Sequence, residues 1–111
     1  MSWDATLVTA CCGTNRGDWN YTYNTTPMTV AAAATVGVEW GGFQHTLDGM
    51  EALEAASVLA AICDEMVRNS SRYEDMNPEN GWGDRVGIVK VMREMVDASL
   101  AAPEGSVWRV S

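Results

Sequence analysis

The first residues of the chain alternate between apolar and polar positions, which is typical of a β-strand. The strand predicted from this pattern covers residues 2–12. One of its faces carries Trp3, Ala5, Leu7 and Cys11, and the other carries Val8, Ala10 and Cys12. Because apolar residues occupy both faces late in the run, we expect a central strand that is covered on both sides. Residues 13–26 are predicted to be a loop, and residues 106–110 a short final strand.

Three longer segments space their apolar residues as helices do. The first begins at Thr26-Pro27, a hydroxyl cap followed by a proline, and ends near Gly37. The second covers about residues 49–69 and follows the capping-box pattern Asp48-Gly49-Met50-Glu51. Its predicted buried stripe is Met50, Leu53, Ala56, Leu59, Ile62, Cys63, Met66 and Val67, and its predicted outer residues are Glu51, Glu54, Asp64, Glu65 and Arg68. The third covers about residues 84–102, with a predicted buried face of Val89, Met92, Val96 and Leu100.

The segments between these helices differ in how clearly they are patterned. Residues 38–47 fit either a small hairpin around Gly41-Gly42 or an irregular loop, and we favour the loop. Residues 72–76 are predicted to add one further helical turn. With these assignments the order of elements is strand, three helices and strand, which predicts a single α+β domain over residues 1–111. We expect its N- and C-terminal strands to pair in a short antiparallel sheet that the three helices pack against.

The loop at residues 77–84 combines strong turn residues with a large aromatic side chain. Asn80-Gly81 is a favourable turn pair, because both residues tolerate positive φ. Asp84 is well placed to cap the following helix by accepting from its free N–H groups. A linker that served only flexibility would not need a tryptophan. We therefore interpret the segment as a rigid loop in which Trp82 is either packed as an anchor or displayed as a contact.

Composition and charge exclude several classes of function. Fifteen acidic and seven basic residues give the 111-residue chain a net charge of −8, which disfavours binding to nucleic acid or to an anionic membrane. Three cysteines, Cys11, Cys12 and Cys63, form neither a disulfide framework nor a zinc motif. We expect them to be reduced and mostly buried in a cytoplasmic protein. No apolar run reaches the roughly 18 residues that span a bilayer.

Few residues suggest catalysis. His45 is the only histidine and has no nucleophile motif beside it. The acidic residues around the loop, Glu74, Asp75, Glu79 and Asp84, do not have calcium-loop spacing. We predict no metal site and no cofactor, and we consider an enzyme less probable than a binding protein.

The stronger candidates for a site are amides and aromatic groups that precede two helix N-termini, where free N–H groups favour anions. The predicted ligand-binding residues are Asn20, Tyr21, Thr22 and Asn24 before the first helix, and Asn77, Asn80, Gly81, Trp82 and Arg85 around the third. Neutral hydrogen-bonding groups beside aromatic faces suit a polar, ring-bearing ligand. The alternative is structural, because asparagines also satisfy loop backbone groups.

The same segments carry a resemblance to a family. They are Asn20-Tyr21-Thr22, Asn24, Pro27-Met28, Leu47-Asp48-Gly49-Met50, Tyr73, residues 76–84 and the closing Val110-Ser111. In these the chain resembles a group of small uncharacterised proteins of bacteria, notably actinobacteria, and of their tailed phages. The chain departs from the pattern at residues 35–46 and at Arg85, where the family usually has an aromatic residue. The resemblance implies a compact intracellular α+β domain, is compatible with a phage origin and brings no activity with it.

Two hypotheses from different classes follow. In the first, the chain is a non-catalytic protein that binds a small polar or nucleotide-like ligand between its two asparagine-rich loops, and a phage could use it to sequester a host immune signal. In the second, it is an adaptor or inhibitor that binds a host protein through an acidic helical face and an exposed aromatic patch formed by Trp19, Trp40 and Trp82. An enzyme is the third alternative. We also expect a homodimer, because the strand that carries Trp108 offers a sheet edge that a second copy could cover.

Overall fold

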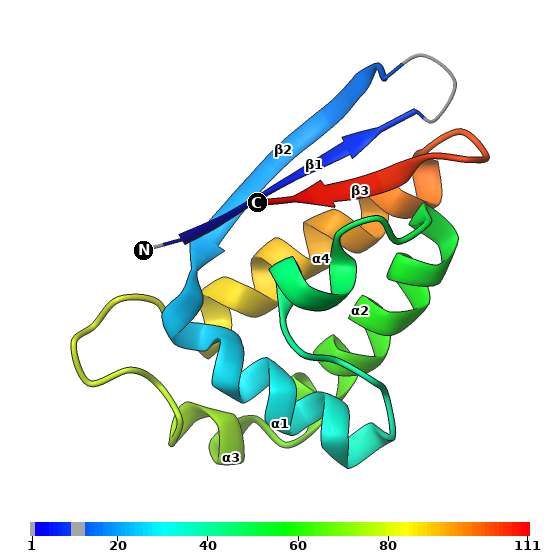
Figure 1. The fold of residues 1–111 in the computed structure, drawn as a ribbon. Coiled ribbons are helices and arrows are strands. Elements are labelled where there is room, and N and C mark those ends of the chain that lie inside the picture. Colours follow the sequence, from blue (N-terminus) through cyan, green and yellow to red (C-terminus); the bar gives the residue numbers. More distant parts are fainter. Residues whose placement is uncertain (1, 10–12) are drawn as a thin grey trace.

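A three-stranded antiparallel sheet forms one layer of the computed structural model, which describes residues 2–9 and 13–111. The strands are β1 (Ser2–Val8), β2 (Asn15–Thr22) and β3 (Val107–Val110), in the order β2-β1-β3. The pairing of the terminal strands is confirmed: the backbone N–H groups of Asp4 and Ser111 each donate to the other's carbonyl at 3.0 and 2.9 Å. Helices pack against this sheet, which confirms the α+β class (Figure 1).

The prediction of a loop at residues 13–26 was wrong, because residues 15–22 form strand β2. Trp19 and Tyr21 of this strand are partly buried against the helical layer, whereas Asp18 and Asn20 are exposed. The ring of Trp19 meets Trp108 edge-on, with centroids 5.3 Å apart and an interplanar angle of 63°. The alternation of inward and outward side chains that is typical of a strand was therefore present in the sequence. It was not recognised because amides and glycine stand where β-branched residues are usual.

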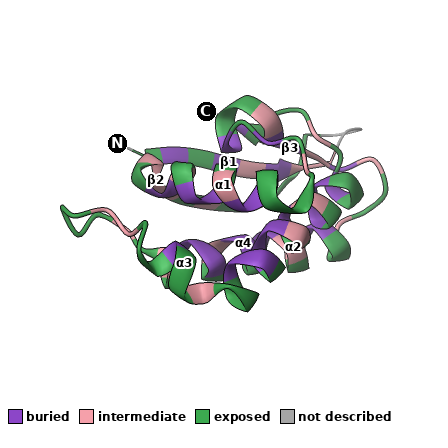
Figure 2. Ribbon diagram, turned by 90° about the horizontal axis from the view of Figure 1, so that it is seen from below, coloured by how far each residue is buried: buried purple, intermediate pink, exposed green. Residues whose placement is uncertain are grey.

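Strand β1 is central in the sheet, but it is covered on only one face. Trp3, Ala5 and Leu7 are buried, whereas Ser2 and Asp4 are exposed. Figure 2 shows α2, α3 and α4 together on one side of the strands. The prediction of cover on both sides was therefore wrong for the described part of the strand, and residues 10–12 lie outside the described residues.

The helical layer contains α1 (Thr26–Val36), α2 (Ala52–Arg68), α3 (Ser70–Glu74) and α4 (Arg85–Ala101). The predicted helices are confirmed to within a few residues. Helix α1 carries a proline in its first turn and ends at Gly37, whose φ of 75° is left-handed and suits glycine. One turn of 3-10 helix, Tyr23–Thr25, joins β2 to α1. The short α3 takes the place of the predicted extra turn.

The start of α2 differs from the predicted capping box. The Asp48 carboxylate accepts from the backbone N–H of Val110 at 2.9 Å instead of capping the helix. The following residues run beside β3: Gly49 N–H donates to the Trp108 carbonyl at 2.8 Å, and Trp108 N–H donates to the Met50 carbonyl at 2.9 Å. The outer edge of β3 is thus occupied and Trp108 is buried. This edge is not the free one that we expected a second copy to cover.

Residues 38–47 form no hairpin. Residues 43–47 make a single π-helical turn, Phe43–Leu47, after an irregular stretch. The ring of Phe43 stacks on Trp3, with centroids 4.0 Å apart and planes at 15°, and meets Trp40 edge-on at 5.0 Å. The Trp40 indole N–H donates to the Thr29 hydroxyl at 3.0 Å. Aromatic packing therefore holds this segment over the end of the sheet and the start of α1.

Some positions of the predicted helix faces are reversed. Leu53, Val67 and Leu100 were expected in the core but are exposed, and Glu65 was expected outside but is buried. The three apolar residues lie at the edge of their stripes, on the side of α2 and α4 that no other described element covers. Glu65 is covered because Tyr73 of α3 packs over it.

Two threonines in the first turn of α1, Thr26 and Thr29, allow a matched test of the core. Thr29 links Trp40 to the backbone and its hydroxyl donates to the Thr26 carbonyl at 2.7 Å, whereas the Thr26 hydroxyl is buried without a hydrogen-bond partner among the described residues. We expect Thr29→Val to destabilise the protein by about 1–3 kcal/mol, and Thr26→Val to be neutral or slightly stabilising. Urea unfolding followed by circular dichroism measures both. Equal losses would mean that Thr26 has a partner of its own.

Candidate functional site

The most prominent surface feature is the connection between α3 and α4. We call residues 77–84 the Trp82 loop. It extends from the body of the protein, as the yellow-green segment of Figure 1 and the leftmost segment of Figure 2 show. Trp82 is 62% exposed. Of the two alternatives for this tryptophan, packed anchor or displayed contact, the structure has the displayed one. The predicted patch of three exposed tryptophans is wrong, because Trp40 is buried and Trp19 is partly buried.

The two ends of the Trp82 loop are tied together by polar side chains. The Asn77 amide oxygen accepts from the backbone N–H of Arg85 at 2.9 Å, and its N–H₂ group donates to Glu74 Oε2 at 2.9 Å. Arg85 Nε donates to Glu74 Oε1 at 2.7 Å, and its guanidinium also reaches the Met66 carbonyl at 3.4 Å. The Arg85 bond, followed by the Asn77 bond, lowers the pKa of Glu74 from its usual value. The loop is therefore closed at its base and fastened to α2 and α3.

Within the loop, Trp82 sits on a turn of defined geometry. The Asn80 side-chain oxygen accepts from the backbone N–H of Trp82 at 2.9 Å. Gly81 has a φ of 74°, which an asparagine–glycine turn allows, and its N–H donates to the Pro78 carbonyl at 3.2 Å. The expected turn at Asn80-Gly81 is thus present, and the backbone that carries Trp82 is held on both sides of the turn.

A second attachment joins the Trp82 loop to strand β2. The backbone N–H of Asp84 donates to the Tyr21 hydroxyl at 3.1 Å, although the two residues are 63 positions apart. Gly83 and Gly87 leave room for this contact. A Cβ at Gly83 would lie 2.5 Å from Thr22 Cγ2, and one at Gly87 would collide with the Tyr21 hydroxyl. The Asp84 carboxylate accepts from Gly87 N–H at 2.7 Å and caps α4, as predicted.

The predicted site residues are only partly brought together. Tyr21 and Thr22 meet the Trp82 loop, but Asn20 is exposed on the face of β2 opposite to Tyr21, because side chains alternate along a strand. Asn24 is exposed in the turn before α1, where its backbone N–H donates to the Thr22 hydroxyl at 3.2 Å. Asn77, Asn80 and Arg85 take part in the bonds that shape the loop.

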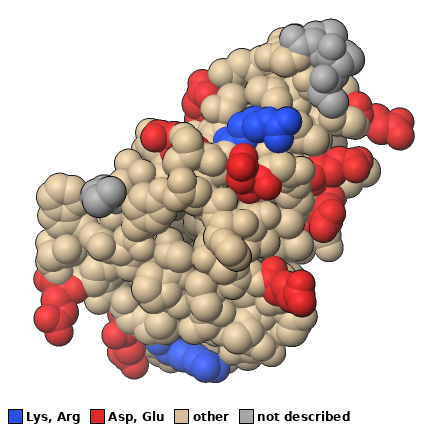
Figure 3. Space-filling model, viewed as in Figure 1, with Lys and Arg blue, Asp and Glu red and all other residues tan. Residues whose placement is uncertain are grey.

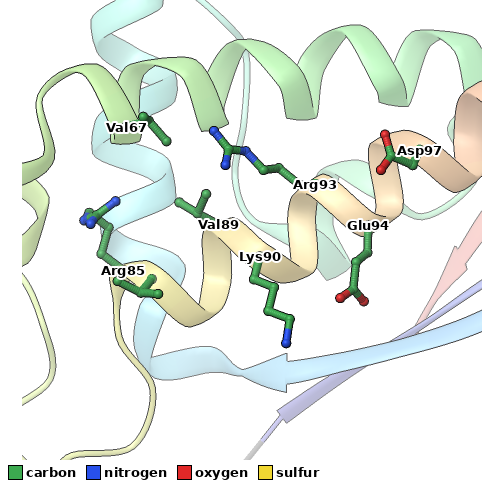
Figure 4. A pocket seen from close by; sticks show the side chains of 8 residues that line it. Val67, Arg85, Val89, Lys90, Arg93, Glu94 and Asp97 are labelled. Carbon is green, nitrogen blue, oxygen red and sulfur yellow. The ribbon is translucent and has the colours of Figure 1, made fainter.

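Among the predicted site residues, Arg85 also borders a surface depression. The depression has a volume of about 430 Å³ and lies between α2 and α4 rather than between the two asparagine-rich segments. Figure 4 shows its lining residues, with Arg85, Val89 and Arg93 directed from α4 toward α2. It is wide and open, and its exposed floor is mainly apolar.

The charge around the Trp82 loop is acidic. Between Arg72 and Arg85 the sequence holds four acidic residues and no basic one: Glu74, Asp75, Glu79 and Asp84. Glu74 is paired with Arg85, and the other three are exposed. Elsewhere acidic side chains are spread over the surface, as Figure 3 shows for one face. The exposed indole is therefore carried by a loop rich in carboxylates. Asp75, Glu79 and Asp84 form no ion pair with a described residue, although Asp84 caps α4.

The described residues offer few reactive groups. Within residues 2–9 and 13–111, no group of three or more His, Cys, Asp or Glu side chains could hold a metal ion. His45 is exposed and lies over Gly41. Burial raises the pKa of the Cys63 thiol to about 12, so that this cysteine is a weak nucleophile. In the same described part of the chain, no helix has the length and apolar character needed to cross a membrane.

Sequence reasoning missed one buried polar cluster. Glu65 accepts from the Tyr73 hydroxyl at 2.6 Å and from the Asn69 amide at 3.0 Å. Burial, and then the bond to Glu65, raise the pKa of Tyr73 above its usual value of 10.0. A carboxylate beside the buried positions Ile62 and Met66 was the available signal, but its partner on α3 could not be identified without the fold. This cluster fixes α3 on α2 and thereby positions the Trp82 loop.

Comparison of the chain with protein-family models, with curated proteins and with solved structures found no match.

We expect Asn77→Ala to loosen the base of the Trp82 loop. The substitution removes the acceptor for Arg85 N–H and a donor to Glu74. We expect this to lower the stability of the loop base by about 1 kcal/mol. Hydrogen exchange of the Arg85 amide should become several-fold faster, whereas the Gly87 amide, held by Asp84, should keep its rate. Equal acceleration at both amides would instead mean that α4 as a whole has lost stability.

We expect Tyr73→Phe to destabilise the protein by about 1–3 kcal/mol, because a buried Glu65 oxygen loses its donor. Tyr23→Phe is the control, since the Tyr23 hydroxyl bonds Gln44 at an exposed position and should matter less. The raised pKa adds a pH test. Because the folded state favours the protonated phenol, Tyr73 contributes its full stabilisation below pH 10.0. This contribution to the free energy of unfolding is lost as the pH rises toward the folded-state pKa. Urea titrations should therefore show a flatter alkaline decline for Tyr73→Phe, and an unchanged decline would contradict this.

Proposed function

We propose that the chain is a non-catalytic, cytoplasmic protein that binds another protein as an adaptor or inhibitor. Its main contact is Trp82, inserted into an apolar pocket of the partner. The observation that carries this proposal is an exposed tryptophan on a loop that is closed at its base and fastened to β2. An isolated surface tryptophan on a mobile linker would carry no such argument.

Energetic considerations support this reading. Tryptophan is among the residues most enriched at the centres of protein interfaces, where its large apolar ring is fully desolvated. Ordering a flexible loop on binding opposes association, and a loop that is already ordered avoids much of that loss. The bonds of Asn77, Asn80 and Tyr21 hold the backbone on both sides of Trp82 before any partner arrives.

Charge narrows the class of partner. Asp75, Glu79 and Asp84 surround the loop with negative charge, and the chain as a whole carries −8. A pocket with a basic rim would complement this surface, and its attraction would raise the association rate at low salt. The partner that fits is therefore a protein with an apolar pocket bordered by lysine or arginine.

Binding of a small nucleotide-like ligand is the second candidate. What supports it is that Tyr21 and Thr22 meet Gly83 and Asp84, so that two of the predicted ligand-binding segments are neighbours. The amide oxygens of Asn77 and Asn80 already accept backbone N–H groups, which favours the protein-binding proposal. Melting curves with nucleotides and cyclic dinucleotides test this candidate, and a rise in Tm that Tyr21→Phe abolishes would support it over the first.

For the protein-binding proposal we expect Trp82→Ala to remove the partner. The unmodified protein and this variant would each be immobilised and incubated with a bacterial cell lysate. Mass spectrometry would then quantify the proteins that bind to each. A specific partner should fall at least tenfold, because losing a central tryptophan contact is worth about 2 kcal/mol or more. With the purified partner, Glu79→Lys should slow association and weaken its dependence on salt.

The matched control is Val30→Gln, which changes an exposed apolar residue of α1, outside the Trp82 loop. It should bind the partner like the unmodified chain, and both variants should melt as the unmodified protein does. Identical sets of bound proteins for the unmodified chain and Trp82→Ala would overturn the proposal.

A further inference from the structure

A second surface lies on the outer side of α2 and α4, where half of the large exposed apolar residues gather. Leu53, Val67, Val86 and Leu100 are exposed by 60, 42, 58 and 62%. On α2 the positions 53, 60 and 67 are spaced by seven residues, and on α4 so are the positions 86, 93 and 100. Seven residues are close to two helical turns, so each set forms one stripe. We call these six residues the outer α2/α4 face.

The two stripes run side by side in opposite directions. Val67 and Val86 border the depression of about 430 Å³ at one end, and Leu53 and Leu100 border another of about 320 Å³ at the other end. Ala60 and Arg93 border a third, of about 270 Å³, between them. The face therefore has an apolar pair at each end and a small residue beside an arginine at its centre.

Charge distinguishes the two ends of this face. The depression at the Val67/Val86 end is bordered by basic and acidic side chains, whereas the Leu53/Leu100 end is bordered by Glu51 and Glu104 alone. The charged residues at the first end are Arg85, which pairs with Glu74, and Lys90, Arg93, Glu94 and Asp97. Glu94 follows Lys90 by one helical turn, and both side chains leave α4 on the side away from α2 (Figure 4). One end of the face thus carries charges of both signs, and the other end carries acidic side chains.

We propose that a second copy of this chain covers the outer α2/α4 face. The two-fold axis lies in the interface and crosses the helices at Ala60 and Arg93. The two Arg93 side chains then lie near each other, and Asp64 and Asp97 of each copy, which border the same depression as Arg93, offset their charge. Helix α4 then packs antiparallel on α4 of the second copy, and α2 on α2, in a four-helix arrangement. Each Val67/Val86 end meets the Leu53/Leu100 end of the other copy, and Lys90 comes within one helical turn of Glu94 of the second copy.

Self-complementarity is what selects a second copy as the occupant. Rotation about an axis across the helices matches each apolar pair with an apolar pair and brings Lys90 near Glu94 of the other copy at two symmetry-related places. An axis along the helices would instead bring the two Leu53/Leu100 ends together, with the acidic Glu51 and Glu104 of both copies, which is unfavourable. The arrangement also removes four large apolar side chains from water, which is the usual role of homodimer interfaces.

The first test is sedimentation velocity of the full chain from micromolar to submillimolar concentration. We expect a reversible dimer. The double variant Leu53→Gln with Leu100→Gln should raise the dissociation constant by at least about tenfold, while Val30→Gln and Trp82→Ala should leave it unchanged. The Trp82 variant separates this proposal from the protein-binding one. A monomer at every concentration, or a dimer that is insensitive to the leucine variants, would overturn the proposal.

A charge exchange tests the register. Lys90→Glu should weaken the dimer, because it brings a like charge near Glu94 of the second copy. Adding Glu94→Lys restores opposite charges at both symmetry-related positions, so that the dimer should recover at unchanged net charge. A loss that persists in the double variant would overturn this register.

Cross-linking tests the position of the axis. Ala60→Cys should form a disulfide-linked dimer on mild oxidation, because a residue on a two-fold axis meets its own copy. Val30→Cys and the unmodified chain, which has three cysteines of its own, give the background. Linkage of Ala60→Cys no faster than this background would place the interface elsewhere.

Discussion

The contact of Tyr21 with the start of α4 is the interaction on which the arrangement of the protein's surface depends. Its hydroxyl holds the backbone of Asp84, and its ring occupies the space that Gly83 and Gly87 leave free. Through this one side chain, strand β2 sets where the Trp82 loop ends and where α4 begins. A larger residue at either glycine would separate sheet and helix, so the position of the loop depends on the absence of two side chains.

The two-layer architecture follows from burial on a single face of the sheet. Trp3, Leu7 and Trp108 point into the helical layer, and the opposite face of β1 is polar enough to remain in water. With one layer of helices, α2 and α4 also have an inner and an outer side. Their outer side stays exposed in a single chain, and this explains why Leu53 and Leu100 are not in the core even though they fit the helical stripes.

Much of this fold could be predicted from local patterns, and the failures have physical causes. The end of α1 at Gly37 and the start of α4 at Asp84 could be predicted because capping depends on residues that are close in sequence. Strand β2 was not, because its strand character comes from packing of Trp19 and Tyr21 on distant residues and not from its own propensity. The capping box at Asp48 failed for a similar reason: its carboxylate is recruited by Val110, 62 positions away.

For the site, the sequence indicated the loop and its turn, but the direction of each side chain depended on the register of β2. Asn20 and Tyr21 are neighbours in sequence and lie on opposite faces of the sheet, and no pattern in the loop residues contains that information.

The two proposed surfaces are linked, because Val86 of the outer α2/α4 face directly follows the Trp82 loop in the chain. An antiparallel second copy would place its own loop beyond the far end of α4. Helix α4 has 17 residues, so the two loops would stand roughly 25 Å or more apart. A dimer would then present two tryptophans on rigid loops at a fixed separation, which raises affinity for a partner that is itself symmetric or repeated. Dimerisation would in this way turn a small single contact into a bivalent one without any change in the loop.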